Sequence, residues 1–275
     1  MARLLDIRVP LLMALVFAYG CGESGSAGQG RARARPAPPA EWLDLDPEQP
    51  GLRLRDPRTG LVFRRVEPGS FEMGRDRAGE GPRHTVQITR PYLIAETELP
   101  ASVFRQYLEA SKSPLEFEGM PDGNLPAPVS FQDAVEFCAF YGYRLPTEAE
   151  WEFACLGGRS PDDPRFEDPD LLGEEAWFHT NAGDGGKPIA TRQPNPLGLY
   201  DMLGNLWEWC SDFHAHSYQV QGDPQVDPKG PEGGAGRVLR GGSWFTIPGP
   251  VPQTRTPGAE NERNDFYGMR PVVDA

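Results

Sequence analysis

The side chains that could carry metal or nucleophilic chemistry are few, since this chain of 275 residues has only four histidines and four cysteines. No two histidines stand four residues apart on a predictable helix, which is the spacing typical of a helical zinc site. Ser243 and Thr246 have no histidine or lysine base placed beside them by the sequence, so neither is predicted to be a nucleophile. The histidines are His84, His179, His214 and His216, and only the last two could share one strand face.

Composition limits the elements that could position such groups. Gly 32 and Pro 30 together make up nearly a quarter of the chain, so long regular elements are expected to be scarce. Because 38% of the residues are hydrophobic and 10% aromatic, the chain can still bury a core, and one domain of roughly 200 residues is predicted. A net charge of -13 repels a phosphate backbone and predicts no nucleic-acid partner.

The amino terminus has the layout of an export signal, predicted over residues 1–20. Arg3 and Arg8 precede an uncharged run, residues 9–19, which is too short to cross a hydrocarbon layer of roughly 30 Å as a helix. The run ends at Cys21 in a sequence that resembles a bacterial lipobox, so lipidation of Cys21 and a membrane anchor are predicted. Ordinary cleavage by signal peptidase is the alternative. Either outcome places the protein outside the cytoplasm, in the bacterial cell envelope or secreted.

A spacer is predicted after Cys21, over residues 21–58, because residues 22–40 contain almost no large apolar side chain. The folded domain is predicted over residues 59–275, with mixed helix and strand and much irregular chain, an α+β class. Residues 157–196 are expected to be loops. Strands are predicted over residues 61–66, 85–88, 92–95, 237–240 and 266–272.

Three helices are predicted between residues 100 and 156. Apolar residues recur at helical spacing after Pro100, which indicates the first helix. Ser130 with Asp133 is an N-cap pattern for the second helix, and Thr147 with Glu150 is a capping box for the third.

Six short sequence blocks follow one another along the predicted domain. They are Phe71–Gly74, Arg144–Glu152, Asn195–Met202, Gly204–Trp209, Arg240–Trp244 and Gly268–Arg270. In order and spacing they resemble the signatures of the formylglycine-generating enzyme (sulfatase-modifying factor) family, and the resemblance covers residues 61–273. It implies a single domain related to C-type lectins, with little regular secondary structure.

The catalytic cysteines of the family have no counterpart in this chain. In the enzymes that oxidise a sulfatase cysteine, two cysteines after the Gly-Gly-Ser block bind copper(I), which requires soft thiolate ligands. The matching positions are Thr246 and Val251, and no cysteine follows Cys210. Copper is therefore not expected, and formylglycine-generating activity by that chemistry is predicted to be absent.

A structural calcium site is implied by the block that begins at Asp201. In the family, the matching block binds calcium through the side chains at Asp201 and Glu208 and through the backbone carbonyls at Gly204 and Leu206. Hard oxygen ligands and two carboxylates suit calcium. The alternative is that Asp201 and Glu208 cap turns and pair with arginines.

The remaining cysteines are expected to be buried free thiols. Cys138 and Cys155 match helix cysteines that form disulfides in some family members, but their partners near the carboxyl end are missing, with Pro271 in one position. A bridge from Cys155 to Cys138 or to Cys210 is the alternative.

A surface groove is implied near the Gly-Gly-Ser block, where ligand specificity would be determined. The resemblance leaves three functions open. The first is a binding or structural lipoprotein that recognises a protein or a cell-envelope component. The alternatives are a divergent oxidoreductase, of the kind that oxidises siderophore chromophores, and a sulfatase-activating enzyme of another arrangement. The candidate groove residues are Ser243, Trp244, Thr246, Arg255 and Asn264.

Overall fold

The computed structural model describes residues 41–49, 51–77, 79–113 and 119–275. The predicted export signal, Cys21 and residues 22–40 lie outside these described residues.

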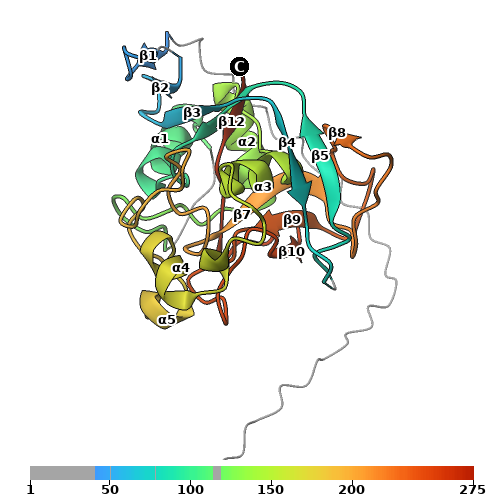
Figure 1. Ribbon diagram of the computed structural model, residues 1–275. Coiled ribbons are helices and arrows are strands. Elements are labelled where there is room, and N and C mark those ends of the chain that lie inside the picture. Colours follow the sequence, from blue (N-terminus) through green and yellow to red (C-terminus); the bar gives the residue numbers. More distant parts are fainter. Residues whose placement is uncertain (1–40, 50, 78, 114–118) are drawn as a thin grey trace, which may run out of the picture. The chain divides into compact units, whose positions relative to one another are not determined.

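One antiparallel sheet of five strands joins the two ends of the described chain (Figure 1). Its strands, in spatial order, are β1 (Leu43–Asp44), β2 (Arg53–Arg55), β3 (Val62–Val66), β6 (Tyr92–Ala95) and β12 (Val272–Asp274). Strands β3 and β6 lie where the sequence predicts them.

The predicted spacer is wrong for residues 41–58, because β1 and β2 belong to this sheet. Asp56 is fully buried and accepts hydrogen bonds from Arg58 and from the hydroxyl of Tyr143. Trp42 packs edge-on against Phe63, with ring centroids 5.2 Å apart. Sequence reasoning placed the boundary too late because these polar and arginine-rich strands contain little apolar sequence of their own.

Two smaller sheets complete the strands. One has the order β10 (Arg255–Gly258), β9 (Arg237–Arg240), β7 (Trp207–Phe213) and β11 (Tyr267–Gly268). The other has the order β4 (Gly69–Met73), β5 (His84–Ile88) and β8 (Gln225–Val226). The prediction missed β4, β7, β8 and β10, and the strand predicted over residues 266–272 is divided into β11 and β12. Strand β4 begins at Gly69, within the segment that the sequence predicts as a Pro-Gly turn.

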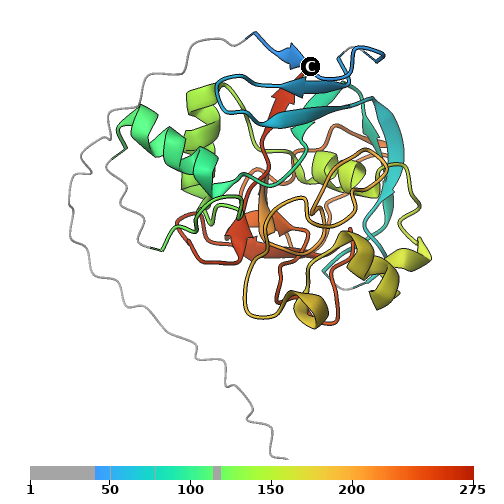
Figure 2. The ribbon, with the colours of Figure 1, turned by 90° about the vertical axis from the view of Figure 1, so that its left-hand side faces the viewer.

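The three predicted helices are present as α1 (Ala101–Ser111), α2 (Phe131–Tyr141) and α3 (Glu148–Leu156). Both predicted capping boxes form, since Ser130 accepts from the backbone N–H of Asp133 and Thr147 from that of Glu150. Helices α1 and α2 lie side by side (Figure 2).

Residues 157–196 are not all loop, which corrects the prediction. They form the short helices η1 (Pro164–Phe166), α4 (Pro169–Glu175) and α5 (His179–Ala182). Asp163 and Asp168 cap the first two, each followed by Pro at the first helical position. Helices of three to seven residues are too short to show an apolar stripe in sequence.

The core has two main apolar clusters that meet at β6. Leu93 and Ala95 belong to the cluster under α1 and α2, whereas Tyr92 and Ile94 belong to the cluster around α3. Successive strand residues point to opposite faces, so β6 is buried on both sides.

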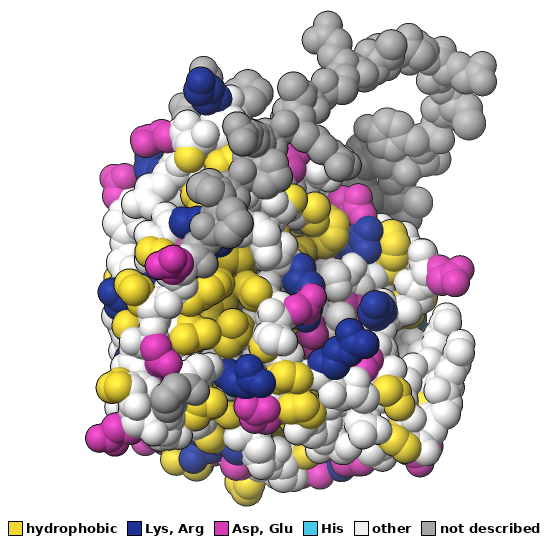
Figure 3. Space-filling model, turned by 90° about the horizontal axis from the view of Figure 1, so that it is seen from above, with side chains coloured by type: hydrophobic (Ala, Val, Ile, Leu, Met, Phe, Trp, Pro, Cys, Tyr) yellow, Lys and Arg dark blue, Asp and Glu magenta, His cyan; other side chains and the backbone are white. Residues whose placement is uncertain are grey.

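The surface seen in Figure 3 carries positive and negative side chains interspersed around hydrophobic areas, with no stripe of one sign. None of the helices within the described ranges is long and apolar enough to cross a bilayer.

Candidate functional site

The segment that follows the Gly-Gly-Ser block forms a turn and contains no cysteine. The Thr246 hydroxyl accepts a hydrogen bond from the backbone N–H of Ser243 at 2.8 Å. Val251 is buried, and its N–H donates to the hydroxyl of Thr254 at 2.9 Å. The side chain of Thr246 therefore stabilises the turn after Gly242, and Val251 packs in the core.

The three described cysteines, Cys138, Cys155 and Cys210, are buried free thiols, as predicted, and no disulfide joins them. Burial raises the pKa of the Cys138 and Cys155 thiols, so neither is a ready thiolate at neutral pH.

An aromatic patch lies at the Gly-Gly-Ser block. We define it as Trp244, Phe245 and Phe266. Trp244 stacks on Phe266 with centroids 5.0 Å apart, and Phe245 meets the edge of Trp244 at 5.6 Å. Phe245 is 54% exposed and Ile247, two residues further on, is 62% exposed. Phe245 and Ile247 are therefore exposed apolar side chains beside the stacked, largely buried ring of Trp244.

Four of the five groove candidates gather at this patch. Ser243 and Thr246 form the turn that carries Trp244. Asn264 accepts from the backbone N–H of Phe266 at 3.0 Å and so fixes the ring that Trp244 covers.

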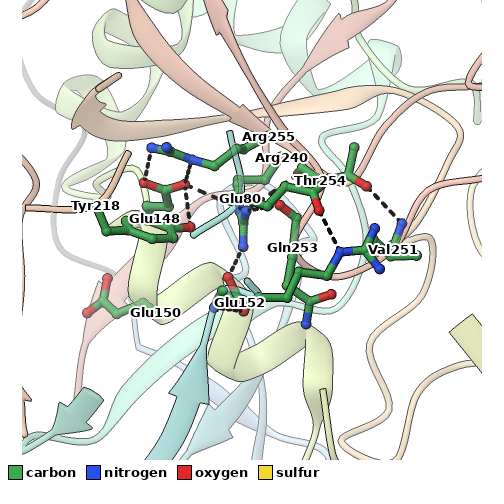
Figure 4. Close-up of polar contacts among 12 residues, drawn as sticks. Glu80, Glu148, Glu150, Glu152, Tyr218, Arg240, Val251, Gln253, Thr254 and Arg255 are labelled. Atoms are coloured by element: carbon green, nitrogen blue, oxygen red, sulfur yellow. Dashed lines mark hydrogen bonds and ion pairs between the residues drawn. The ribbon is translucent and has the colours of Figure 1, made fainter. Parts of the chain in front are cut away.

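Arg255 lies elsewhere, in a buried ion-pair network (Figure 4). It donates to both carboxylate oxygens of Glu148, at 2.6 and 2.9 Å, and to the backbone oxygen of Ala215 at 2.7 Å. All of these partners are remote from Trp244 in sequence, and none belongs to the patch. The polar groove around Trp244, Arg255 and Asn264 that would favour a divergent oxidoreductase thus gains no support.

Sequence reasoning missed the cation at the centre of this network, Arg240. It is fully buried, hydrogen-bonds to Glu152, and lies 3.6 Å from Glu148. The spacing of Glu148 and Glu152 places both on one face of α3, and this was the available signal. It could not identify the partner, which is 88 residues away from Glu152.

The predicted calcium ligands divide into two kinds. Both oxygens of Glu208 are used, since Arg270 donates to them at 2.8 to 3.1 Å and the Trp151 indole donates at 2.7 Å. Asp201 accepts from the N–H of Ala190 through Oδ2, while its buried Oδ1 has no partner. Glu208 thus matches the arginine-pairing alternative, and Asp201 has a free oxygen that fits a cation.

The backbone of this block is tightly constrained. Gly204 has φ +78°, and a Cβ there would lie 2.0 Å from the carbonyl oxygen of Trp177, so only glycine fits. The N–H of Leu206 donates to the carboxylate of Glu98 at 2.9 Å.

Charge is unbalanced around this block, which bears on the calcium prediction. Burial raises the pKa of Glu98, and the carboxylates of Asp201 and Glu208 raise it further. Burial also raises the pKa of Asp201 to about 6. No three His, Cys, Asp or Glu side chains of the described residues cluster as a metal site. Calcium would therefore depend on Asp201 Oδ1 and the carbonyls of Gly204 and Leu206, and it stays a prediction.

Comparison with known proteins identifies the family. The family profile described as "Sulfatase-modifying factor enzyme 1-like domain" matches residues 55–275. The chain is 31% identical to the formylglycine-generating enzyme of Streptomyces coelicolor, over 72% of this chain and 82% of that protein. It is also 35% identical to the serine/threonine-protein kinase pkn1 of Chlamydia caviae, over 52% of this chain but only 23% of the kinase.

Solved structures agree on the fold. Treponema denticola variable protein 1 has a TM-score of 0.68 at 26% identity, covering 78% of this chain and 95% of that one. PvdO from Pseudomonas aeruginosa has a TM-score of 0.69 at 24% identity, and the match covers 82% of this chain and 99% of PvdO. The predicted single domain of mixed helix and sheet is confirmed, and the chain belongs to the formylglycine-generating enzyme (sulfatase-modifying factor) family.

Proposed function

We propose that this protein is an exported, lipid-anchored binding protein of the bacterial cell envelope, whose domain recognises a protein or an envelope component through the aromatic patch. One observation carries the proposal. The segment after the Gly-Gly-Ser block presents Phe245 and Ile247 to solvent, and it has Thr246 and Val251 at the positions where the resemblance implies copper-binding thiolates. Exposed apolar side chains on a fixed turn suit recognition.

The anchor rests on the sequence around Cys21. A short apolar run that ends in a lipobox-like sequence supports lipidation at that cysteine. An acylated Cys21 would hold the domain at the membrane surface, and the domain itself needs no apolar span.

A first experiment tests the loss of copper chemistry. The purified protein is loaded with copper(I) and incubated with oxygen and a Cys-x-Pro-x-Arg peptide, and aldehyde formation is followed by mass spectrometry. The Streptomyces coelicolor relative serves as the positive control. We expect no aldehyde, and turnover of the peptide would overturn this part of the proposal.

A second experiment tests the patch. A double variant, Phe245→Ser with Ile247→Ser, is compared with Val226→Ser, which alters an equally exposed apolar residue on β8. Proteins cross-linked in the envelope fraction are identified by mass spectrometry. We expect the double variant alone to lose its cross-linked partners. Identical partners for both variants would contradict binding through the patch.

A third experiment tests the anchor. Replacement of Cys21 by Ser should move the protein from the membrane fraction to the soluble envelope fraction. An amino-terminal peptide of the unaltered protein should carry acyl mass on Cys21. A free amino-terminal peptide without acyl mass would show ordinary signal cleavage instead.

A further inference from the structure

A cavity of about 520 Å³ lies apart from the aromatic patch, and none of the patch residues lines it. It opens between the start of α3, strands β4 and β5, and the chain after β7. Neither the family signatures nor the proposed function assigns it a role. The side chains that decide its chemistry are His84, Glu148, Asp212, Tyr218, Glu232 and Arg255.

Part of the cavity wall is rigid and already satisfied. The ring of Tyr218 contacts both His84 and Arg255. The ring centroids of Tyr218 and His84 are 5.1 Å apart, and the Arg255 guanidinium carbon lies 4.5 Å from the centroid of Tyr218. The Tyr218 hydroxyl donates to Glu148 at 3.2 Å. Glu148 and Arg255 pair through two hydrogen bonds, and Arg240 lies 3.6 Å from Glu148 as well, so these groups give the site its shape and leave no excess negative charge in it.

His84 supplies an acceptor that has no partner. Its Nδ1 lies 2.9 Å from the backbone oxygen of Pro82, and because a carbonyl can only accept, Nδ1 carries the hydrogen. Nε2 of the neutral ring is then an acceptor. The residue is 8% exposed and Nε2 has no hydrogen-bond partner. A buried acceptor of this kind is costly unless a donor reaches it.

Asp212 supplies a second acceptor. Its Oδ2 accepts from the N–H of Glu148 at 2.9 Å and from the Ser211 hydroxyl at 3.1 Å. No donor among the described residues bonds to Oδ1. The side chain is buried, and burial together with the charge of Glu148 raises its pKa to about 7. A cation beside it would favour its charged form.

The remaining charges favour a cationic ligand. With Glu148 and Arg255 paired, the charged groups left at the cavity are the buried Asp212 and the exposed Glu232 and Lys229, so one carboxylate is in excess. A primary ammonium group carries one positive charge and three donors, which matches two unpaired acceptors and this excess of carboxylate. We infer that the cavity binds a primary ammonium group, supplied either by a small free amine or by a lysine side chain of another protein. This inference does not rest on the proposed function.

The test is a titration of the isotopically labelled full chain, followed by NMR of the side-chain nitrogens of His84. Butylamine and Nα-acetyl-lysine amide are the probes, and butanol and Nα-acetyl-norleucine amide are their uncharged counterparts. We expect both amines, and neither counterpart, to shift the Nε2 resonance of His84. Tighter binding of butylamine would indicate a free amine as the source, and tighter binding of the lysine amide a protein side chain.

Two variants in the cavity and one control outside it locate the site. His84→Phe keeps a ring against Tyr218 but removes the acceptor, and Asp212→Asn keeps an oxygen to cap α3 but removes the charge. Each should weaken amine binding about tenfold or more, which corresponds to about 1.4 kcal/mol. Asp122→Asn is the control, since Asp122 is a 99% exposed carboxylate bonded to Arg105. It should bind as the unaltered protein does.

Because either cavity variant could fold poorly, Glu232→Gln provides a surface substitution at the same cavity, and it should weaken binding by a smaller factor, about threefold. Amine and uncharged probes that bind equally, or an amine affinity that none of the three cavity variants changes, would overturn the inference. The patch experiments above are unaffected by either result.

Discussion

Buried charge is the most consequential feature at the scale of single residues. Arg240 and Arg270 are both fully buried, and each faces carboxylates that are buried as well. Such pairs add little net stability as pairs, but removing one partner leaves the other charge without compensation in a medium of low dielectric.

Arg270→Gln is the sharpest test of this argument. It leaves Glu208 without its cation, near Asp201 and Glu98, whose carboxyl groups are also buried. We expect the free energy of unfolding, measured with urea, to fall by about 3–5 kcal/mol. Arg65→Gln is the control, because the pair of Arg65 with Glu67 is exposed and should contribute less than about 1 kcal/mol. Equal losses would show that the buried pair has no special role.

Asp212 predicts an unusual dependence of stability on pH. Burial raises the pKa of Asp212 from 3.8 to about 7, so between these values the folded protein holds more protons than the unfolded chain. The contribution of Asp212 to stability is therefore largest at low pH and falls as pH rises to about 7. Asp212→Asn should flatten the dependence of the melting temperature on pH between about pH 4 and about pH 7. A variant with the same slope as the unaltered protein would contradict the raised pKa.

Calcium is a third prediction at this scale. If Asp201 Oδ1 binds the ion, a calcium concentration about a hundredfold above its Kd should stabilise the fold by about 2.7 kcal/mol. The melting temperature should rise with calcium and fall with a chelator, and Asp201→Ala should abolish the difference. Magnesium is the matched control, because it demands shorter, octahedral coordination. No shift with calcium would leave Asp201 as a turn residue.

At the scale of elements, helix starts could be predicted because their signals are local. The residues that cap α2 and α3 lie within three positions of one another, so the sequence displays them directly. Strand β7 could not be predicted in the same way, since it is buried by residues from distant segments such as Phe131, which packs edge-on against Trp209.

The same contrast between local signals and contacts with distant segments applies to the candidate site. The absence of thiols at Thr246 and Val251, and the block that begins at Asp201, can be identified from local sequence. The position of Arg255 could not be predicted, because its partner Glu148 is 107 residues away. The sequence predicts Arg255 as a groove residue, but its guanidinium pairs with Glu148 at the start of α3.

Thr147→Ala tests the cap of α3. It removes the hydroxyl that accepts from the N–H of Glu150, and the free energy of unfolding should fall by about 1 kcal/mol. Thr147→Ser keeps the hydroxyl and should stay close to the unaltered protein. Chemical denaturation of the three proteins gives the comparison, and an equal loss in both variants would point to packing of the Thr147 methyl group instead.

At the scale of the whole molecule, the amino-terminal boundary matters for stability. A chain that starts at residue 59 lacks β1 and β2 as well as Asp56, which leaves the hydroxyl of Tyr143 with Thr59 alone, at 3.2 Å. We expect it to melt well below a chain that starts at residue 41, because it loses the pairing of β2 with β3 and a buried hydrogen bond to a carboxylate, which alone is worth about 1.5–3 kcal/mol. Differential scanning calorimetry makes the comparison. Equal melting temperatures would restore the later boundary.

Strand β6, buried on both faces, links the two halves of the core. Its four residues alternate between the two apolar clusters, and its backbone pairs with β3 on one side and β12 on the other. Neither cluster can open without exposing residues of the other, so the domain should lack separate foldons. The backbone amides of β6 should accordingly exchange with solvent deuterium only when the entire domain unfolds.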